Sequence, residues 1–110
     1  MQQFEINRKI ILIDRKAEKE INKFPQKVQV ELRACLSVLE KIGYLKKQMG
    51  KKIGFDLFEI RIACQGQFRS IYAYLAHPKI IILSAFQKKT NKTPIKEINK
   101  ARQRLKKYLN

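Results

Sequence analysis

Three strand-length apolar segments follow one another in the second half of the chain. They span residues 57–62, 68–75 and 80–87. The connections between them, residues 64–67 and 76–78, are short enough for hairpin turns and contain Gly66 and Pro78. Strands joined by such turns pair with their sequence neighbours and run antiparallel. The sequence therefore predicts a three-stranded antiparallel meander.

The first and last of these strands differ in pattern. In the first, apolar residues alternate with Glu59 and Arg61, which predicts that the charged pair lies on the face opposite the core. The last contains residues 80–83, which are apolar at every position and therefore suit a strand that is buried on both faces. We expect this third strand to be central in the sheet.

Helical periodicity precedes the meander. An isoleucine-rich strand over residues 6–13 ends at Asp14, whose side chain suits a helix N-cap. Apolar residues then recur at helical spacing over residues 15–24 and 28–42, and Pro25 separates the two runs. The pattern predicts a strand followed by a pair of helices.

Residues 44–54 have the composition of an exposed loop. They follow Gly43, a residue that suits the left-handed end of a helix, and contain two further glycines. Their lysines are Lys46, Lys47, Lys51 and Lys52. Such a cluster either guides a polyanion or is simply solvated, and the pattern leaves both interpretations open.

A C-terminal helix completes the prediction. Thr93 and Pro94 suit its N-cap and first turn, and an apolar stripe continues over residues 95–108, where Glu97 is the only acid among many cations. At 110 residues the chain has the size of one domain, residues 1–110. The expected class is α+β: a small antiparallel sheet, made of the meander plus an N-terminal strand, with an N-terminal helical pair and a C-terminal helix.

The charge of the chain restricts its partners. A formal net charge of +16, from 25 Lys and Arg against 9 Asp and Glu, attracts polyanions and makes the folded chain repel itself. Nucleic acid and an acidic protein are therefore the natural partners. We expect a cytoplasmic protein that does not bind membranes, because there is no long apolar run and no signal-like start. Cys35 and Cys64 fit no metal or redox motif and are expected to be free thiols.

Familiar catalytic motifs are missing from the sequence. There is one histidine, no glycine-rich phosphate loop and no cluster of acids for a divalent metal, so we expect no metal and no cofactor. The one histidine, His77, precedes Pro78 in a turn and is expected to be a solvated loop residue. RNA cleavage is still chemically possible, because the 2′-OH of RNA can attack the adjacent phosphate when it is positioned in line.

The candidate catalytic residues are cations of the meander. Arg61 and Arg69 lie near the two sides of one hairpin, and if they share a face they can hold a phosphate with their fork-shaped donors. Lys88 and Lys89 would complete the cluster, and crowding could lower the pKa of one lysine enough for proton transfer. The alternative is that Arg61 pairs with Glu59 and that the lysines are solvated.

Candidate RNA contacts lie beside these cations. They are Tyr72, Lys51, Lys52 and Lys92. Tyr72 shares a strand face with Phe68 and Tyr74, so its ring either packs in the core or offers a stacking platform for a base.

Several segments, taken in order, resemble a known family. They are LFEIR at residues 57–61, FRSIY at 68–72, FQKKT at 86–90, and the Thr93, Pro94, Glu97, Ala101 series. The series resembles the RelE/HigB-type toxins of type II toxin–antitoxin systems and covers most of the chain. The resemblance implies a RelE-like fold, a compact sheet with helices packed against one side.

The resemblance also implies an activity and partners. Members of this family are typically mRNA interferases that cut message in the ribosomal decoding site without a metal, and an antitoxin holds them inactive. Arg69, Lys88 and Lys89 match basic positions of the family, and Arg61 matches a basic strand position. Where some relatives have a proton-transfer tyrosine, this chain has Ile95. The implied partners are a cognate antitoxin and ribosome-bound mRNA, with DNA reached only through the antitoxin.

The leading hypothesis is a ribosome-dependent endoribonuclease toxin. Two alternatives stay open: a ParE-like gyrase inhibitor without catalysis, and a non-enzymatic nucleic-acid-binding module whose affinity falls steeply with salt. Removing Arg69 distinguishes the enzyme from the binding module. In the enzyme it should abolish activity at little cost in folding, whereas in the module it should weaken binding only slightly.

Overall fold

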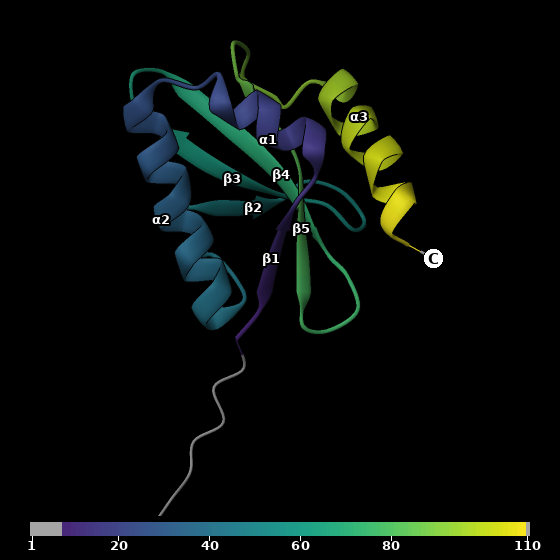
Figure 1. The fold of residues 1–110 in the computed structure, drawn as a ribbon. Coiled ribbons are helices and arrows are strands. Elements are labelled where there is room, and N and C mark those ends of the chain that lie inside the picture. Colours follow the sequence, from purple (N-terminus) through teal and green to yellow (C-terminus); the bar gives the residue numbers. More distant parts are fainter. Residues whose placement is uncertain (1–7, 110) are drawn as a thin grey trace, which may run out of the picture.

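The computed structural model describes residues 8–109, which form a five-stranded sheet with helices (Figure 1). Its elements are, in order, β1 (Ile10–Ile13), α1 (Arg15–Asn22), α2 (Gln26–Ile42), β2 (Gly50–Lys52), β3 (Phe58–Ala63), β4 (Gln67–Tyr74), β5 (Lys79–Gln87), α3 (Ile95–Leu105) and the short 3-10 helix η1 (Lys106–Tyr108). The predicted α+β class, with its helical pair and C-terminal helix, is confirmed.

The sheet has the strand order β1-β5-β4-β3-β2. The antiparallel meander of β3, β4 and β5 is confirmed, and β5 lies inside the sheet between β4 and β1, as its apolar sequence predicted. One detail of the predicted antiparallel sheet is wrong, because β1 pairs parallel to β5. These two strands are far apart in the chain, so no hairpin turn sets their direction. Residues 6 and 7, the start of the predicted N-terminal strand, lie outside the described residues.

The predicted loop over residues 44–54 contains a short strand. β2 pairs antiparallel with β3, with Gly50 opposite Ile60 and Lys51 opposite Glu59. The residue types did not predict this strand, because β2 consists of one glycine and two exposed lysines. Charged residues are common on edge strands, although lysine has little preference for strands in general.

Local signals at the ends of α1 and α2 are confirmed, whereas the predicted Thr93 cap of α3 is wrong. Pro94 is the N-cap of α3, no side chain caps this helix, and the Thr93 hydroxyl donates to Glu59 instead. The Asp14 carboxylate accepts hydrogen bonds from the backbone N–H groups of Lys16 and Ala17, at 3.0 and 3.4 Å, and so caps α1. Gly43 ends α2 with a φ of 82°, and its N–H donates to the Leu39 carbonyl. Glycine adopts this left-handed conformation without the steric cost that a Cβ imposes.

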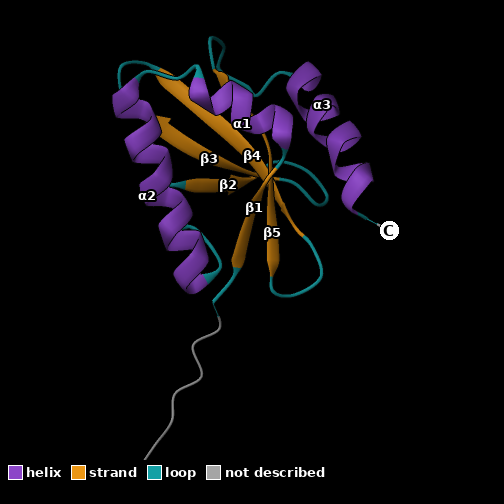
Figure 2. Ribbon diagram, viewed as in Figure 1, coloured by secondary structure: helices purple, strands orange, loops and turns teal. Residues whose placement is uncertain are grey.

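Helices cover both faces of the sheet, and Figure 2 shows the sheet lying between α2 and α3. One core joins α1 and α2 to the face that carries Ile60, Ile80 and Ile82. A second core joins Ala101 and Leu105 of α3 to the other face. The one-sided arrangement implied by the resemblance is therefore wrong. A strand such as β5, which is apolar on both faces, requires cover on each side.

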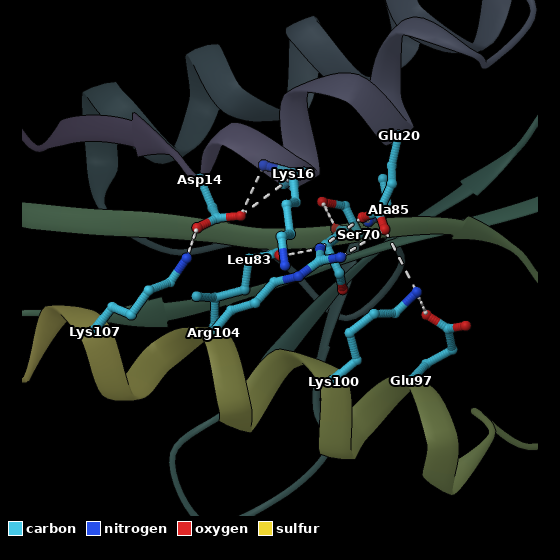
Figure 3. Close-up of polar contacts among 12 residues, drawn as sticks. Asp14, Lys16, Glu20, Ser70, Leu83, Ala85, Glu97, Lys100, Arg104 and Lys107 are labelled. Atoms are coloured by element: carbon cyan, nitrogen blue, oxygen red, sulfur yellow. Dashed lines mark hydrogen bonds and ion pairs between the residues drawn. The ribbon is translucent and has the colours of Figure 1, made fainter.

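Polar contacts fix α3 against α1 and β5 (Figure 3). The Arg104 guanidinium donates to both carboxylate oxygens of Glu20, at 2.8 and 2.9 Å, and to the Leu83 carbonyl at 2.8 Å. Glu20 also accepts from the Ala85 N–H, and the Tyr108 hydroxyl donates to Asp14 at 2.6 Å. We call Asp14, Glu20, Arg104 and Tyr108 the α3 tether. It sets where the segment that leads into α3 crosses the sheet, and that segment forms one wall of the site described next.

Candidate functional site

A cleft of about 330 Å³ opens between β2, β3 and the segment that joins β5 to α3. Its lining is Lys51, Lys52, Ile53, Glu59, Arg61, Lys88, Asn91, Lys92, Thr93 and Ile98. We call it the basic cleft. It brings together five residues singled out from the sequence, Lys51, Lys52, Arg61, Lys88 and Lys92, which come from three separate parts of the chain.

The strand register explains this convergence. Arg61 of β3 lies directly opposite Arg69 of β4, so the two arginines share a sheet face, as the hairpin required. Lys51 lies opposite Glu59 on the same face, and the Lys88 N–H donates to the Gln67 carbonyl, which continues the β4–β5 pairing beyond the end of β5. Side chains opposite each other on paired strands are neighbours, so the cations must crowd together.

Glu59 lies at the centre of this crowd, with an exposed fraction of 2%. One carboxylate oxygen is 3.7 Å from Arg69 Nε and 3.9 Å from Arg61 Nε, and the other accepts a hydrogen bond from the Thr93 hydroxyl at 2.6 Å. The sequence reasoning considered Glu59 only as a counterion of Arg61. The sequence pattern did not indicate that Glu59 is buried or that Thr93 donates a hydrogen bond to it. Both depend on α3 and the segment before it, which cover this face of the sheet. The alternation of charged residues along β3 was the only available signal.

Arg69 is buried beneath the basic cleft and does not line it, with 5% of its surface exposed. Its Nη1 donates to the Phe68 carbonyl at 2.9 Å and to Gln67 Oε1 at 3.3 Å. Burial lowers the pKa of Arg69, Glu59 opposes this effect, and the positive charge of Arg61 adds to it. The expectation that Arg69 holds a phosphate directly stays a prediction, and in this structure its guanidinium is buried beside Glu59.

Lys88 shows the expected effect of crowding. Burial lowers the pKa of Lys88, and the positive charges of Arg69, Arg61 and Lys51 lower it further, against the opposing charge of Glu59. An ammonium group in this position is closer to proton transfer than a solvated one. Lys89, its neighbour, is exposed and does not line the basic cleft, so its catalytic role stays a prediction.

Tyr72 lies on the other side of the sheet. Its ring belongs to the core under α2, is 2% exposed and stacks on Phe58 at a centroid distance of 5.5 Å. Of the two alternatives for Tyr72, the structure favours core packing over a free stacking platform. His77 is exposed in the β4–β5 turn, where its Nδ1 lies 3.0 Å from Lys9 Nζ, and it is absent from the basic cleft.

Residues 8–109 lack two features that other functions require. They contain no group of three or more His, Cys, Asp or Glu side chains arranged to hold a metal ion. None of their helices is both long enough and apolar enough to cross a bilayer. Cys35 is buried, Cys64 is half-buried, and both are free thiols, as expected.

Several solved structures with a similar fold are a toxin or toxin–antitoxin complexes. The free RelE toxin of E. coli, solved as a double arginine-to-alanine mutant, matches with a TM-score of 0.68 and 15% identity, over 89% of this chain and 98% of that chain. The intact E. coli RelBE toxin–antitoxin complex matches with a TM-score of 0.61 and 18% identity, and the RelBE2 toxin–antitoxin complex of Mycobacterium tuberculosis with 0.56 and 16%; each match covers 74% of this chain and 99% of the other. At these identities the likeness shows a common fold.

The family follows from the sequence itself. No curated protein matches the chain. The family model described as phage-derived Gp49-like protein (DUF891) matches residues 19–106, which run from α1 to the end of α3 and include every residue of the basic cleft. The chain therefore belongs to the Gp49-like family, and it has the fold of the RelE toxins.

Proposed function

We propose that this protein is the toxin of a type II toxin–antitoxin system and that it cleaves mRNA on the ribosome, in the cytoplasm, until a cognate antitoxin inhibits it. The observation that carries the proposal is the basic cleft, where Arg61, Lys88 and the lysines of β2 converge around one buried carboxylate. Membership of the Gp49-like family and the RelE fold support it by analogy.

The chemistry needs little from the protein beyond charge and position. The 2′-oxygen attacks the adjacent phosphorus, the bond from phosphorus to the 5′-oxygen breaks, and a 2′,3′-cyclic phosphate remains. The proton of the 2′-OH passes to a base, and the leaving 5′-oxygen gains a proton. In the transition state, negative charge grows on the phosphoryl oxygens, and cations already in position stabilise it without reorganising. Arg61, Lys51, Lys52 and Lys92 are placed to do so.

Lys88 is assigned to proton transfer. Its lowered pKa gives it a larger neutral fraction near neutrality than a solvated lysine has, and it lies in the cleft beside Arg61. Glu59 and Arg69 have a positioning role: Glu59 lines the cleft and pairs with Arg61, while Arg69 lies beneath the cleft and pairs with Glu59. Because the ribosome already orients the message, the protein has to supply only charge stabilisation and proton transfer.

Cleavage of mRNA on purified translating ribosomes tests the proposal. Wild type should produce site-specific cuts with 2′,3′-cyclic phosphate ends. Arg61→Ala should reduce the rate by roughly 10²–10³-fold, the loss typical of removing one charge-stabilising donor. Lys27→Ala, which removes an exposed lysine of α2 outside the cleft, is the matched control and should cut normally. Intact message with normal translation would rule the proposal out. DNA damage signalling in cells that express the protein would then favour gyrase inhibition.

A pH profile tests the role of Lys88. Because its pKa is lowered, the wild-type rate should rise with pH and level off below the pKa of an ordinary lysine, 10.5. Lys88→Arg keeps the positive charge but does not titrate in this range. It should bind RNA as wild type does, cut slowly and lose the rising limb. If Lys88→Arg kept both the wild-type rate and the rise of the rate with pH, Lys88 would contribute only its positive charge.

A further inference from the structure

A second pocket, of about 470 Å³, lies across β2 from the basic cleft, on the other face of the sheet. Its aromatic residues are Tyr44, Phe58, Tyr72 and Tyr74. Tyr44 is 57% exposed, whereas the buried Tyr72 closes the floor beneath Phe58. We call it the aromatic pocket. Its volume falls in the range of pockets that hold drug-sized ligands, roughly 300–1,000 Å³.

The rings of Phe58, Tyr72 and Tyr74 in this pocket are held in place by contacts with one another. Tyr74 packs edge-on against Phe58 at 5.1 Å, and its hydroxyl donates to the Gly43 carbonyl at 2.7 Å. Tyr44 follows Gly43 directly, so the left-handed end of α2 sets the point from which the Tyr44 ring projects. A platform of fixed rings loses little conformational entropy when a flat ligand stacks on it.

The aromatic pocket and the basic cleft share a rim. Lys51, Lys52 and Arg61 line both. Lys52 lies opposite Phe58 in the register, and its Nζ is 5.9 Å from the centre of the Phe58 ring. β2 is a short edge strand with no further strand beyond it, so a ligand chain can pass over it from one face to the other.

We propose that the aromatic pocket binds a nucleobase of the same RNA strand whose phosphates occupy the basic cleft, with Tyr44 as the exposed stacking surface. The inference rests on the proposed function. Aromatic rings interleaved with cations are the combination that binds single-stranded nucleic acid, because rings stack with bases while cations meet phosphates. The shared lysines hold the phosphate that precedes or follows the base. Stacking tolerates every base, so the pocket recognises an unpaired base by its ring rather than by its sequence.

An equilibrium measurement separates the base from the phosphates. The probes are fluorescent hexadeoxyadenylate and its fully abasic counterpart, which carry the same charge and cannot be cut because they lack the 2′-OH. Wild type should bind the base-containing probe at least about fivefold more tightly, since one stacked base contributes roughly 1–3 kcal/mol. In Tyr44→Ala this ratio should fall by about the same factor, and Tyr44→Trp should restore it.

Phe55→Ala is the matched control. Phe55 is an aromatic residue that is 89% exposed on the segment between β2 and β3 and lines neither the aromatic pocket nor the basic cleft. It should leave the ratio unchanged. Because Tyr44 is largely exposed, its removal should also leave thermal unfolding unchanged, and this is checked by circular dichroism.

The outcomes distinguish this inference from the proposed function. If wild type bound both probes with equal, salt-sensitive affinity, the base pocket would be overturned and the phosphate cleft would stand. A ratio of affinities that Tyr44→Ala does not alter would have the same meaning. A pocket used only by a protein partner gives the same result. Failure to bind either probe would also overturn the base pocket, whereas the proposed function is decided separately by cleavage of mRNA on ribosomes. If both are right, Lys88→Arg, which changes a residue of the basic cleft outside the aromatic pocket, slows cleavage and keeps the base-dependent ratio, whereas Tyr44→Ala loses the ratio.

Discussion

The α3 tether and the basic cleft are each built around one glutamate, yet their electrostatics differ. Glu20 of the tether accepts two hydrogen bonds of 2.8 and 2.9 Å from one arginine and a third from a backbone N–H. Glu59 of the cleft has arginine Nε atoms at 3.7 and 3.9 Å, and Thr93 supplies its one short hydrogen bond. In the tether each charge meets a partner, whereas in the cleft the cations outnumber the acid.

This difference separates a group of charges that holds the fold from one in which positive charge is left uncompensated, as the proposed function requires. In the cleft, Arg69 Nε has no hydrogen-bond partner among the described residues, and the pKa of Lys88 is lowered by burial and by neighbouring cations. Uncompensated positive charge costs folding energy unless an anion binds, and binding then stabilises the folded chain. Sites of function are where such local conflicts are expected.

The largest expected effect is on stability, in the tether. Arg104→Ala removes both hydrogen bonds to the half-buried Glu20 and the one to the Leu83 carbonyl, and we expect a loss of about 3 kcal/mol, the upper end for hydrogen bonds to charged groups. Arg102→Ala is the control on the same helix, because Arg102 pairs with Asp56 where both side chains are 41% exposed, and it should cost less than about 1 kcal/mol. Urea unfolding measures both. Equal losses for the two variants would show that the tether contributes nothing special.

Arg69→Ala should affect both stability and cleavage. Because Arg69 is buried and satisfies the Phe68 carbonyl and Gln67, its removal should lower the free energy of unfolding by about 1–3 kcal/mol. This differs from the expectation of little cost in folding. Arg61→Ala, at a half-exposed position, should lose cleavage while stability changes by no more than about 0.5 kcal/mol. Chemical denaturation of both variants is the measurement, and an Arg69→Ala protein as stable as wild type would contradict the positioning role.

Acid should weaken the tether. Burial acts to raise the pKa of Glu20, but hydrogen bonds from Arg104 and Ala85, with the charges of Arg104 and Lys100, outweigh it, and the pKa is lowered from 4.5. A carboxylate with a lowered folded-state pKa stabilises the fold above its unfolded pKa, and this contribution disappears as pH falls through the folded pKa. Wild type should therefore lose stability below about pH 4.5, and Glu20→Gln should lose less over the same range. Thermal melts from pH 7 to pH 3 measure this, with Glu31→Gln on α2 as the exposed control.

The smallest expected effect is on the salt dependence of RNA affinity. Lys51→Ala or Lys92→Ala removes one cation from the basic cleft, and each should reduce the slope of log affinity against log salt by about 1. Affinity measured over a range of salt concentrations gives the slope. Lys27→Ala should leave the slope closer to that of wild type, because Lys27 lies outside the cleft. Identical slopes for all three variants would show that the cleft does not hold phosphates.

Much of the local structure could be predicted from the residues themselves. The Asp14 cap, the Gly43 helix end, the interior position of β5 and the shared face of Arg61 and Arg69 all follow from interactions between neighbours in sequence or across one hairpin. Such contacts have short range, so a period of 2 or 3.6 residues and a turn signal are enough to specify them.

The tertiary structure alone decided which residues are buried beneath the site. The parallel pairing of β1 with β5, the cover of the second sheet face by α3, and the contact of Thr93 with Glu59 each join residues that are distant in the chain. Arg69 is therefore buried, although its place in the strand pattern matched that of the half-exposed Arg61. The sequence by itself determined which charges the site contains and on which strands they lie. Their burial, pairing and access to a ligand depend on packing between distant segments, which no local pattern encodes.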